Sequence, residues 1–359
     1  STTVKANNTT YYVSTSGSDG NNGTSPSTPW KTLDKVNSFN FGPGDKILFK
    51  CGDSWSGTLI INNSGTSGNP ITVGSYGTGS KPLINGGGAY EAVRIDNANW
   101  VVIDGLRITN YDGANVFDGA EGRRDGIKIW GDSNNIVIKN NEIYYVEGFS
   151  NNQNTGLSPR GTSLNPQENN MYMNAAIYQG SYPTVYTSNV TIENNYIHDN
   201  TNMGILTTSA RYNLVIRNNT VSNVGADGIV WWYTIGALVE YNSVYFAGNN
   251  SGTAPRTGNV LGYGGYAVCG IWGYQATDSI QQYNYVEKTQ RIVYDGQAWD
   301  FDIGTVGGVY QYNFSRENEG GFILGGNGTD QICRYNISYN DGTDEYQHYY
   351  GTKEQGFFT

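Results

Sequence analysis

Short apolar runs that alternate with polar residues recur along most of the chain. Eight segments share one pattern, in which a strand-like run is followed by a turn. They are VVIDGLRI (101–108), IVIKNNEI (136–143), VTIENNYI (190–197), LVIRNNTV (214–221), ALVEYNSV (237–244), SIQQYNYV (279–286), GVYQYNFS (308–315) and QICRYNIS (331–338). The sixth position is Asn in seven copies and Leu106 in the first. This pattern predicts short β-strands that end in equivalent turns.

The spacing of these Asn residues indicates a stack of coils. They are Asn141, Asn195, Asn219, Asn242, Asn284, Asn313 and Asn336. Successive spacings are 54, 24, 23, 42, 29 and 23 residues, so a base period of about 23 is interrupted by insertions. Asn tolerates left-handed turn geometry, and its amide can bond to the equivalent amide of a stacked coil. The period therefore predicts a parallel β-solenoid that contains an Asn ladder.

A second strand precedes most copies of the repeat. The examples are DGIKIW (125–130), MGILTTS (203–209), DGIVWW (227–232), CGIWGY (269–274) and GGFILGG (320–326). We expect DFDIG (300–304) to take this position in its own coil. Stacked coils would bring all of these strands into one parallel sheet.

The first third of the chain carries a family resemblance. Its segments YYVSTSGSDGNNGTSPSTPWKTLDKVN, PGDKILFKCGDSW, SGTSGNPITVGSYGTG and PLINGGG resemble the opening of many secreted β-helix polysaccharide enzymes. The whole chain resembles the right-handed parallel β-helix proteins of the pectin-lyase-like superfamily. The resemblance implies an all-β fold, a right-handed parallel β-helix, with a short N-terminal capping helix in WKTLDKVNSF. Because that superfamily includes lyases, hydrolases, epimerases, adhesins and binding modules, the fold does not decide the activity.

Length and composition favour one extracellular domain. We expect a single domain over residues 1–359, with the cap and first coils in 1–95, repeat coils in 96–342 and a C-terminal tail in 343–359. The 49 Gly and 29 Tyr residues fit an all-β chain with many turns. A net charge of −10 disfavours nucleic acid as a partner, and no apolar run is long enough to cross a membrane. We expect a secreted monomer, and three widely spaced cysteines indicate neither a disulfide scaffold nor a zinc site.

Three acids in DGQAWDFDIG (295–304) form the main candidate site. If Phe301 and Ile303 point into the core, Asp300 and Asp302 point outward about 7 Å apart along the strand. Glu319 precedes the following strand, and Asp227 opens a strand two coils earlier, roughly 10 Å away. Glycoside hydrolysis needs two carboxyl groups at such separations. We therefore predict Asp300 and Asp302 as catalytic residues, with Glu319 or Asp227 as partner.

The same sheet carries residues suited to hold a sugar. The predicted substrate-binding residues are Trp231, Trp232, Tyr233, Trp272, Trp299, Asp295, Arg124 and Lys128. Aromatic planes pack against the apolar faces of sugar rings, although about half of these rings must face the core. Two Gly/Asn/Ser-rich insertions, 145–186 and 246–266, are candidates for walls or lids of a cleft. The acidic surroundings favour a neutral plant or algal cell-wall polysaccharide as substrate.

Two other functions stay open. A polysaccharide lyase would need a basic group at the site, and the candidates are Arg123, Arg124, Lys128, Arg160, Arg256 and Arg291. A non-catalytic β-helix would bind polysaccharide through the aromatic residues alone. No cofactor is required for hydrolysis, but Asp295, Asp300 and Asp302 could bind calcium. The resulting prediction is a glycoside hydrolase, with a pectate- or alginate-type lyase and a binding module as alternatives.

Overall fold

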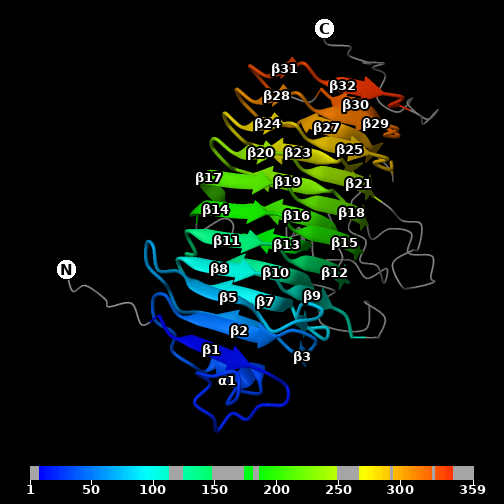
Figure 1. Cartoon of the computed structure of the whole chain (residues 1–359). Helices are drawn as coiled ribbons and strands as arrows, with labels where there is room; N and C mark the ends of the chain where they lie inside the picture. Colours follow the sequence, from blue (N-terminus) through cyan, green and yellow to red (C-terminus); the bar gives the residue numbers. More distant parts are fainter. Residues whose placement is uncertain are drawn as a thin grey trace, which may run out of the picture.

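The computed structural model describes residues 8–112, 124–147, 174–180, 186–248, 267–291, 294–325 and 328–342. Its strands wind into stacked coils, and successive strands of a coil join an eleven-stranded, a ten-stranded and a nine-stranded parallel sheet (Figure 1). The all-β class and the parallel β-helix predicted from the repeat are confirmed. The expected tail, 343–359, lies outside the described residues, and the single-domain division stays a prediction.

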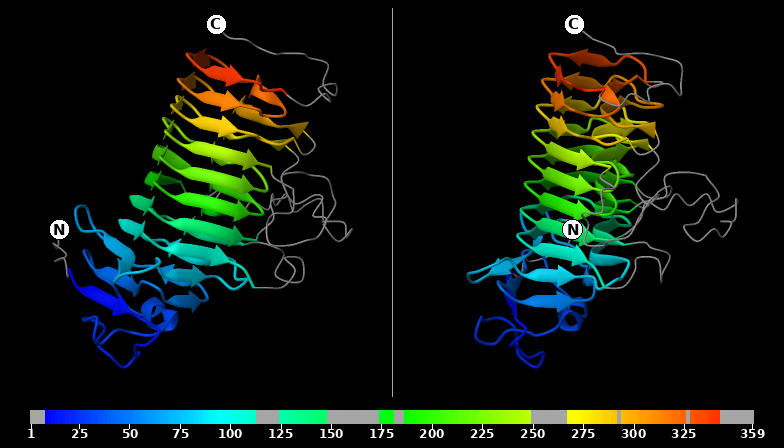
Figure 2. Two further views of the ribbon diagram at one scale, coloured as in Figure 1. Left: turned by 45° about the vertical axis from the view of Figure 1, so that its right-hand side comes forward. Right: turned by 90° about the vertical axis from the view of Figure 1, so that its right-hand side faces the viewer.

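The three sheets run the length of the stack, as the two views in Figure 2 show. The eleven-stranded sheet contains β1 (Thr10–Val13), β2 (Lys46–Lys50), β5 (Ile71–Tyr76), β8 (Val101–Asp104), β11 (Ile136–Lys139), β14 (Thr187–Glu193), β17 (Ala210–Arg217), β20 (Leu238–Glu240), β24 (Ile280–Gln282), β28 (Val309–Gln311) and β31 (Ile332–Arg334). The ten-stranded sheet contains β3 (Ser54–Ser56), β6 (Leu83–Asn85), β9 (Arg107–Asn110), β12 (Glu142–Val146), β15 (Tyr196–Asn200), β18 (Thr220–Val224), β21 (Ser243–Ala247), β25 (Tyr285–Glu287), β29 (Phe314–Arg316) and β32 (Ile337–Tyr339). The nine-stranded sheet contains β4 (Leu59–Ile61), β7 (Glu91–Asp96), β10 (Asp125–Trp130), β13 (Ala175–Gln179), β16 (Met203–Thr207), β19 (Ile229–Trp232), β23 (Ile271–Tyr274), β27 (Gln297–Phe301) and β30 (Gly321–Leu324).

Two short elements lie outside these sheets. Strands β22 (Ala267–Val268) and β26 (Tyr294–Asp295) pair with each other just before β23 and β27. Helix α1 (Leu33–Asn37) begins after Thr32, whose side chain accepts a hydrogen bond from the Lys35 amide. Figure 1 shows α1 at the N-terminal end of the stack, beside β1. The capping role that the resemblance implies for this segment stays a prediction.

The Asn ladder predicted from the repeat is present. The side-chain Oδ1 of each Asn accepts a hydrogen bond from the backbone amide of the equivalent residue in the preceding coil, at 2.9–3.0 Å. Its Nδ2 donates to a carbonyl of that coil, as Asn195 does to Ile138 at 3.0 Å. The ladder therefore provides hydrogen-bond partners for buried backbone amides and carbonyls at a corner of the coil, where strand pairing does not provide them.

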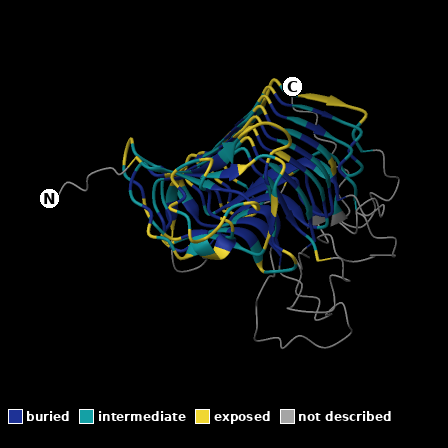
Figure 3. Cartoon of the chain, turned by 60° about the horizontal axis from the view of Figure 1, so that its bottom comes forward, coloured by how far each residue is buried: buried dark blue, intermediate teal, exposed yellow. Residues whose placement is uncertain are grey.

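The interior is a single stack of apolar side chains. In the eleven-stranded sheet, for example, Ile103, Ile138, Ile192 and Ile216 occupy one register position in successive coils and are fully buried. Figure 3 shows the buried strands inside and exposed residues along the corners. Burial of such side chains contributes about 2 kcal/mol each, so register is strongly specified.

The nine-stranded sheet departs from the simple inside–outside alternation that we expect for a solenoid strand. Every residue of β16 and β19 is buried, whichever face of the sheet it occupies. The outward residues form a second apolar cluster, whose fully or largely buried members are Ala175, Met203, Leu206, Ala226, Val230, Trp232, Cys269 and Trp272. The outer face of this sheet is therefore a dry environment in its middle coils.

Candidate active site

Four aspartates gather at the C-terminal end of this dry outer face. Asp300 lies in β27 and pairs in register with Trp272 of β23, while its neighbours Trp299 and Phe301 enter the core. Asp302 follows β27 directly. Asp295 ends β26, and Asp227 lies two residues before β19.

The strand that carries Asp300 begins three residues earlier than the sequence pattern suggests. It is Gln297–Phe301 rather than DFDIG, because Trp299 pairs with Ile271 and Phe301 with Gly273. The predicted outward direction of Asp300 is therefore correct. The predicted inward direction of Ile303 is wrong, since its side chain is 52% exposed beyond the end of the strand.

The backbone at Asp295 is left-handed where the chain enters β27. Asp295 has a φ of 66° and Gly296 a φ of 90°, so two successive residues are left-handed just before β27. Gly320 of the next coil packs so closely that a Cβ there would lie 2.0 Å from the Asp295 carbonyl oxygen. Asp accepts a left-handed conformation more readily than most residues. Such irregular entries to a strand re-aim a side chain and are common beside active sites.

Burial raises the pKa of these carboxyl groups. The pKa of Asp295 rises to about 6, first through burial and then through the charge of Asp302, while Arg291 lowers it. Burial also raises the pKa of Asp302, although the Ile303 amide donates a 2.6 Å hydrogen bond to Oδ1 and lowers it. For Asp300, burial followed by the charges of Asp302, Asp295 and Asp227 raises the pKa far above its ordinary value. The four acids are therefore one electrostatic group.

Asp227 is the most deeply buried member of this group. Its Oδ1 accepts hydrogen bonds from the Cys269 amide and from Trp272 Nε1, both at 2.8 Å. Its Oδ2 and the Oδ1 of Asp300 have no hydrogen-bond partner among the described residues. Burial raises the pKa of Asp227 to about 7, although the hydrogen bonds from Cys269 and Trp272 lower it, and the charge of Asp295 adds a smaller rise.

The predicted aromatic contacts divide between the two faces of the sheet. Trp231 and Trp299 are each 1% exposed and belong to the interior, so they are removed from the predicted substrate-binding set. Trp232 and Trp272 point outward in the second apolar cluster, and Tyr233 packs against it. The division follows strand alternation: Trp231 fills the space above Gly273, where a Cβ would lie 2.6 Å from its indole nitrogen.

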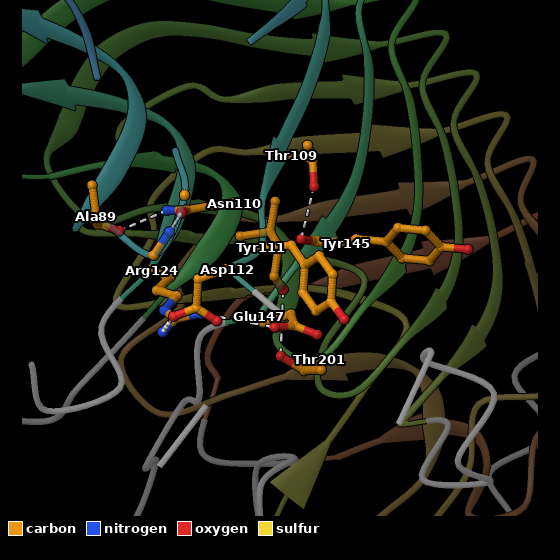
Figure 4. A network of polar contacts seen from close by, with 12 residues as sticks. Ala89, Thr109, Asn110, Tyr111, Asp112, Arg124, Tyr145, Glu147 and Thr201 are labelled. Atoms are coloured by element: carbon orange, nitrogen blue, oxygen red, sulfur yellow. Dashed lines mark hydrogen bonds and ion pairs between the residues drawn. The ribbon is translucent and has the colours of Figure 1, made fainter. Parts of the chain in front are cut away.

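Arg124 and Lys128 lie far from the four aspartates and are already paired. Arg124 is largely buried, and its guanidinium reaches Asp112 at 2.7 Å and Glu147 at 3.8 Å (Figure 4). Lys128 binds the Asp125 carboxylate at 2.9 Å. Five strand steps separate β10 from β27, about 24 Å at the usual spacing. They therefore lie in another part of the sheet than Asp300, and their substrate-binding role stays a prediction.

Glu319 is also separate from the group. Its Oε2 accepts a 2.7 Å hydrogen bond from the Arg291 amide in the preceding coil. Its charge is not among the causes that raise the pKa values of Asp295, Asp300 or Asp302. Of the remaining lyase candidates, Arg291 lies near Asp295, whereas Arg123, Arg160 and Arg256 lie outside the described residues, as does most of each insertion.

Among the described ranges, no group of three or more His, Cys, Asp and Glu side chains is arranged to hold a metal ion. Calcium binding by Asp295, Asp300 and Asp302 stays a prediction. Within the same ranges, no helix has the length and apolar character needed to span a membrane.

Comparison with known proteins agrees with this architecture. A family model described as a right-handed β-helix region matches residues 6–259. The chain belongs to the right-handed β-helix family. It is 28% identical, over 94% of its length, to a lacto-N-biosidase of Bifidobacterium longum subsp. longum, of which the match covers 26%.

Solved structures are similar to the chain along most of its length. A crystal structure of the GH136 lacto-N-biosidase from Eubacterium ramulus matches with a TM-score of 0.74 and 26% identity, over 92% of this chain and 60% of that one. An alginate lyase from Paenibacillus sp. has a TM-score of 0.57 at 16% identity, over 87% of this chain and 97% of that one, and shares the fold alone. The chain thus spans about a quarter of the curated relative and about 60% of the solved lacto-N-biosidase.

The sequence analysis placed Asp295 among the binding residues and did not identify its left-handed backbone. The signal was the Asp-Gly dipeptide at 295–296, a pair typical of left-handed turns, directly before a strand. Cys269 was likewise missed as a neighbour of the acids, because nothing in its spacing shows that its amide binds Asp227.

Proposed function

We propose that this chain is the β-helix part of a secreted glycoside hydrolase that uses Asp295 and Asp302 as its carboxyl pair. The observation that carries the proposal is the asymmetry of these two acids. Burial and then the charge of Asp302 raise the pKa of Asp295 to about 6, whereas burial also raises the pKa of Asp302 but the Ile303 amide opposes that rise. Two adjacent carboxyl groups in different protonation states are what acid and base roles require.

In the proposed reaction, Asp295 donates its proton to the glycosidic oxygen as the carbon–oxygen bond breaks. Asp302 either attacks the anomeric carbon, forming a glycosyl ester that water then hydrolyses, or deprotonates an attacking water. In the first case Asp295 accepts the proton of the incoming water, so the enzyme returns to its starting state. The prediction of Asp302 as catalytic is kept. Asp300 and Asp227 move to supporting roles, and Glu319 is dropped.

The substrate we propose is a glycan that carries a lacto-N-bioside. The similarity to two lacto-N-biosidases, one of them at a TM-score of 0.74, supports this class. The alginate lyase shares the fold alone, so the comparisons do not support the plant or algal polymer that the acidic surroundings suggested. A lyase is less well supported, because Arg124 and Lys128, two of its predicted bases, are held in ion pairs. We propose that hydrolysis needs no calcium or other cofactor.

The test is hydrolysis of a nitrophenyl lacto-N-bioside by the full chain, measured as the release of nitrophenol. In parallel, the chain is incubated with uronate-containing polysaccharides, and the absorbance of unsaturated uronates is measured. We expect nitrophenol release that a chelator does not change. Asp295→Asn and Asp302→Asn should each lose at least about a thousandfold in kcat/KM. Asp330→Asn is the matched control, since it removes one exposed carboxylate at a left-handed position and should keep full activity.

Azide separates the two roles. With Asp295→Ala and Asp302→Ala, added azide replaces the missing group, and the anomeric configuration of the glycosyl azide differs between an acid/base variant and a nucleophile variant. Unsaturated products, full activity of both Asn variants, or no cleavage of any substrate would each overturn the proposed function.

A further inference from the structure

Two coils of the nine-stranded sheet begin with the same motif. Asp125-Gly126-Ile127 opens β10, and Asp227-Gly228-Ile229 leads into β19. Both aspartates are buried, and both accept a hydrogen bond from a backbone amide of the next coil: Asp125 from Ala175 at 2.9 Å and Asp227 from Cys269 at 2.8 Å. Each carboxyl group therefore joins two coils in the same way.

Both glycines are needed for that junction. A Cβ on Gly126 would lie 2.4 Å from the Ala176 carbonyl oxygen, and one on Gly228 would lie 2.5 Å from that of Gly270. The backbones thus approach to the same distance, and the two motifs have the same local structure. What differs is the partner of the second carboxyl oxygen.

Asp125 has a cation and Asp227 has none among the described residues. Lys128 Nζ lies 2.9 Å from Asp125 Oδ2. The register position of Lys128 is occupied in successive strands by Tyr178, Leu206 and Val230, so Val230 stands where a partner for Asp227 would be. Asp227 Oδ2 is left with no hydrogen-bond partner in this part of the chain.

The groups that face Asp227 cannot compensate a negative charge. The preceding strand brings Met203 next to it, the following strand brings Cys269 and Trp272, and beyond these lie Asp295 and Asp300. Each titratable group in this set is an acid. A buried carboxylate with one unsolvated oxygen and no cation is costly, so the neutral form is favoured.

Trp272 links Asp227 to Asp300, whose charge group includes the proposed carboxyl pair. Its indole Nε1 donates to Asp227 Oδ1 at 2.8 Å, and its backbone position pairs with Asp300 in the adjacent strand. The ring belongs to the apolar cluster that keeps the outer face dry. Its hydrogen bond to Asp227 therefore holds an apolar side chain on the strand next to Asp300.

We propose, on the basis of the proposed function, that Asp227 is a positioning residue that acts as a neutral carboxylic acid. In this form it holds Trp272 in place without adding negative charge near Asp295 and Asp302. Hydrogen-bond acceptance by Oδ1 is the required property, and ionisation of the group is harmful. Burial raises the pKa of Asp227 to about 7, which agrees with a neutral group at mildly acidic pH.

The decisive comparison is between Asp227→Asn and Asp227→Leu. Asn keeps the acceptor for Trp272 and the Cys269 amide but cannot ionise, whereas Leu has a similar size and no acceptor. We expect Asp227→Asn to keep kcat/KM within about threefold at pH 5.5 and Asp227→Leu to lose at least about tenfold. The Trp272 indole N–H resonance, assigned with Trp272→Phe, should stay in place for Asn and move for Leu.

Thermal stability gives a second readout that needs no substrate. Because the folded pKa is raised, the folded state keeps a proton that the unfolded state has released, so wild-type stability falls as pH rises from about 4 to about 7. Asp227→Asn lacks this dependence, and its melting temperature relative to wild type should rise by roughly 5 °C between pH 4.5 and 7.5. Asp125→Asn is the matched control, since it strands Lys128 and should lower the melting temperature at both pH values.

Each readout can overturn the inference. Equal losses for Asp227→Asn and Asp227→Leu would mean that the negative charge is needed. An unchanged melting-temperature difference between pH 4.5 and 7.5 would mean that Asp227 is already ionised. Since the resonance and the melting temperatures do not depend on turnover, they test Asp227 even where the chain cleaves no lacto-N-bioside.

Discussion

The two halves of one sheet face treat their acids in opposite ways. In and beside the N-terminal half of the nine-stranded sheet, acids are paired with cations: Arg94 with Asp96 at 3.0 Å, Lys128 with Asp125 at 2.9 Å, and Arg124 with Asp112, which follows β9 of the ten-stranded sheet, at 2.7 Å. In the C-terminal half, the acids are Asp227, Asp295, Asp300 and Asp302, and Arg291 is the cation that lowers a pKa there. The fold can therefore pair a buried acid with a cation, and the candidate site is the place where such cations are few.

The contrast between the two halves is tested first by introducing a cation into the C-terminal half. Val230→Lys places an ammonium at the register position of Lys128, within reach of Asp227. It should ionise Asp227, lower the pKa of Asp295 and disturb Trp272, reducing kcat/KM at least about a hundredfold.

Val230→Met is the control for this change, because it adds length without charge. It should lose less than about tenfold in kcat/KM, with both variants compared at matched melting temperatures. Equal losses for Lys and Met would show that packing at Val230, and not charge, separates the two halves.

Removing a cation from the matched half should affect stability instead. Lys128→Met leaves the buried Asp125 carboxyl without its partner, and we expect a loss of about 2 kcal/mol in the free energy of unfolding. Activity of the folded protein should stay within about twofold, since Lys128 is distant from Asp295.

Denaturant unfolding measures this loss. Lys139→Met is the matched control, because its partner Asp104 is 3.7 Å away and both side chains are about one-third exposed. Such surface pairs contribute little, so the control should change stability by less than about 0.5 kcal/mol. A comparable loss in both variants would remove the distinction between buried and surface pairs.

The uncompensated half should also give the enzyme an acidic pH optimum. Asp295 keeps its proton below about pH 6 and loses it above, because burial and Asp302 raise its pKa. As general acid it is active only when protonated, so kcat/KM should fall about tenfold per pH unit above that value. A profile that stays flat to pH 8 would contradict the acid role of Asp295.

The smallest effect is expected at the acid that lies apart from the group. Glu319→Gln keeps an acceptor for the Arg291 amide and should change kcat/KM by less than about twofold. Measured beside Asp295→Asn, it tests whether position in the electrostatic group, and not mere closeness in sequence, defines the site. A hundredfold loss for Glu319→Gln would restore it to the catalytic set.

The fold was predictable because the repeat encodes it twice, in apolar alternation and in the Asn positions. Both signals are local, and the ladder from Asn141 to Asn336 forms as expected. The site was less predictable. Alternation showed correctly that Asp300 faces outward, but it could not show that β27 begins at Gln297 or that the outer face is buried.

The role of Asp295 depends on contacts between coils, which no periodicity reports. Its left-handed backbone and the charge of Asp302 belong to its own coil, and the close approach of Gly320 comes from the next coil. The same holds for Asp227, whose pKa is raised by burial and which has Val230 at the register position where Asp125 has Lys128. Sequence pattern gives the face on which a side chain lies, whereas pKa values depend on the neighbours that the stack supplies.

The Asn ladder has a direction. Each carboxamide serves the amide of the coil before it, so Asn141 accepts from Leu106 and Asn336 accepts from Asn313. The first member gives only its backbone N–H, which explains how leucine can stand there without loss. Deleting the coil of Asn336 would therefore leave the Asn313 amide without its acceptor, whereas deleting the coil of Leu106 would leave the buried Asn141 carboxamide without the Leu106 amide and the Ile103 carbonyl. Shortening the solenoid should leave an unpaired backbone amide at one end of the ladder and an unpaired side-chain amide at the other.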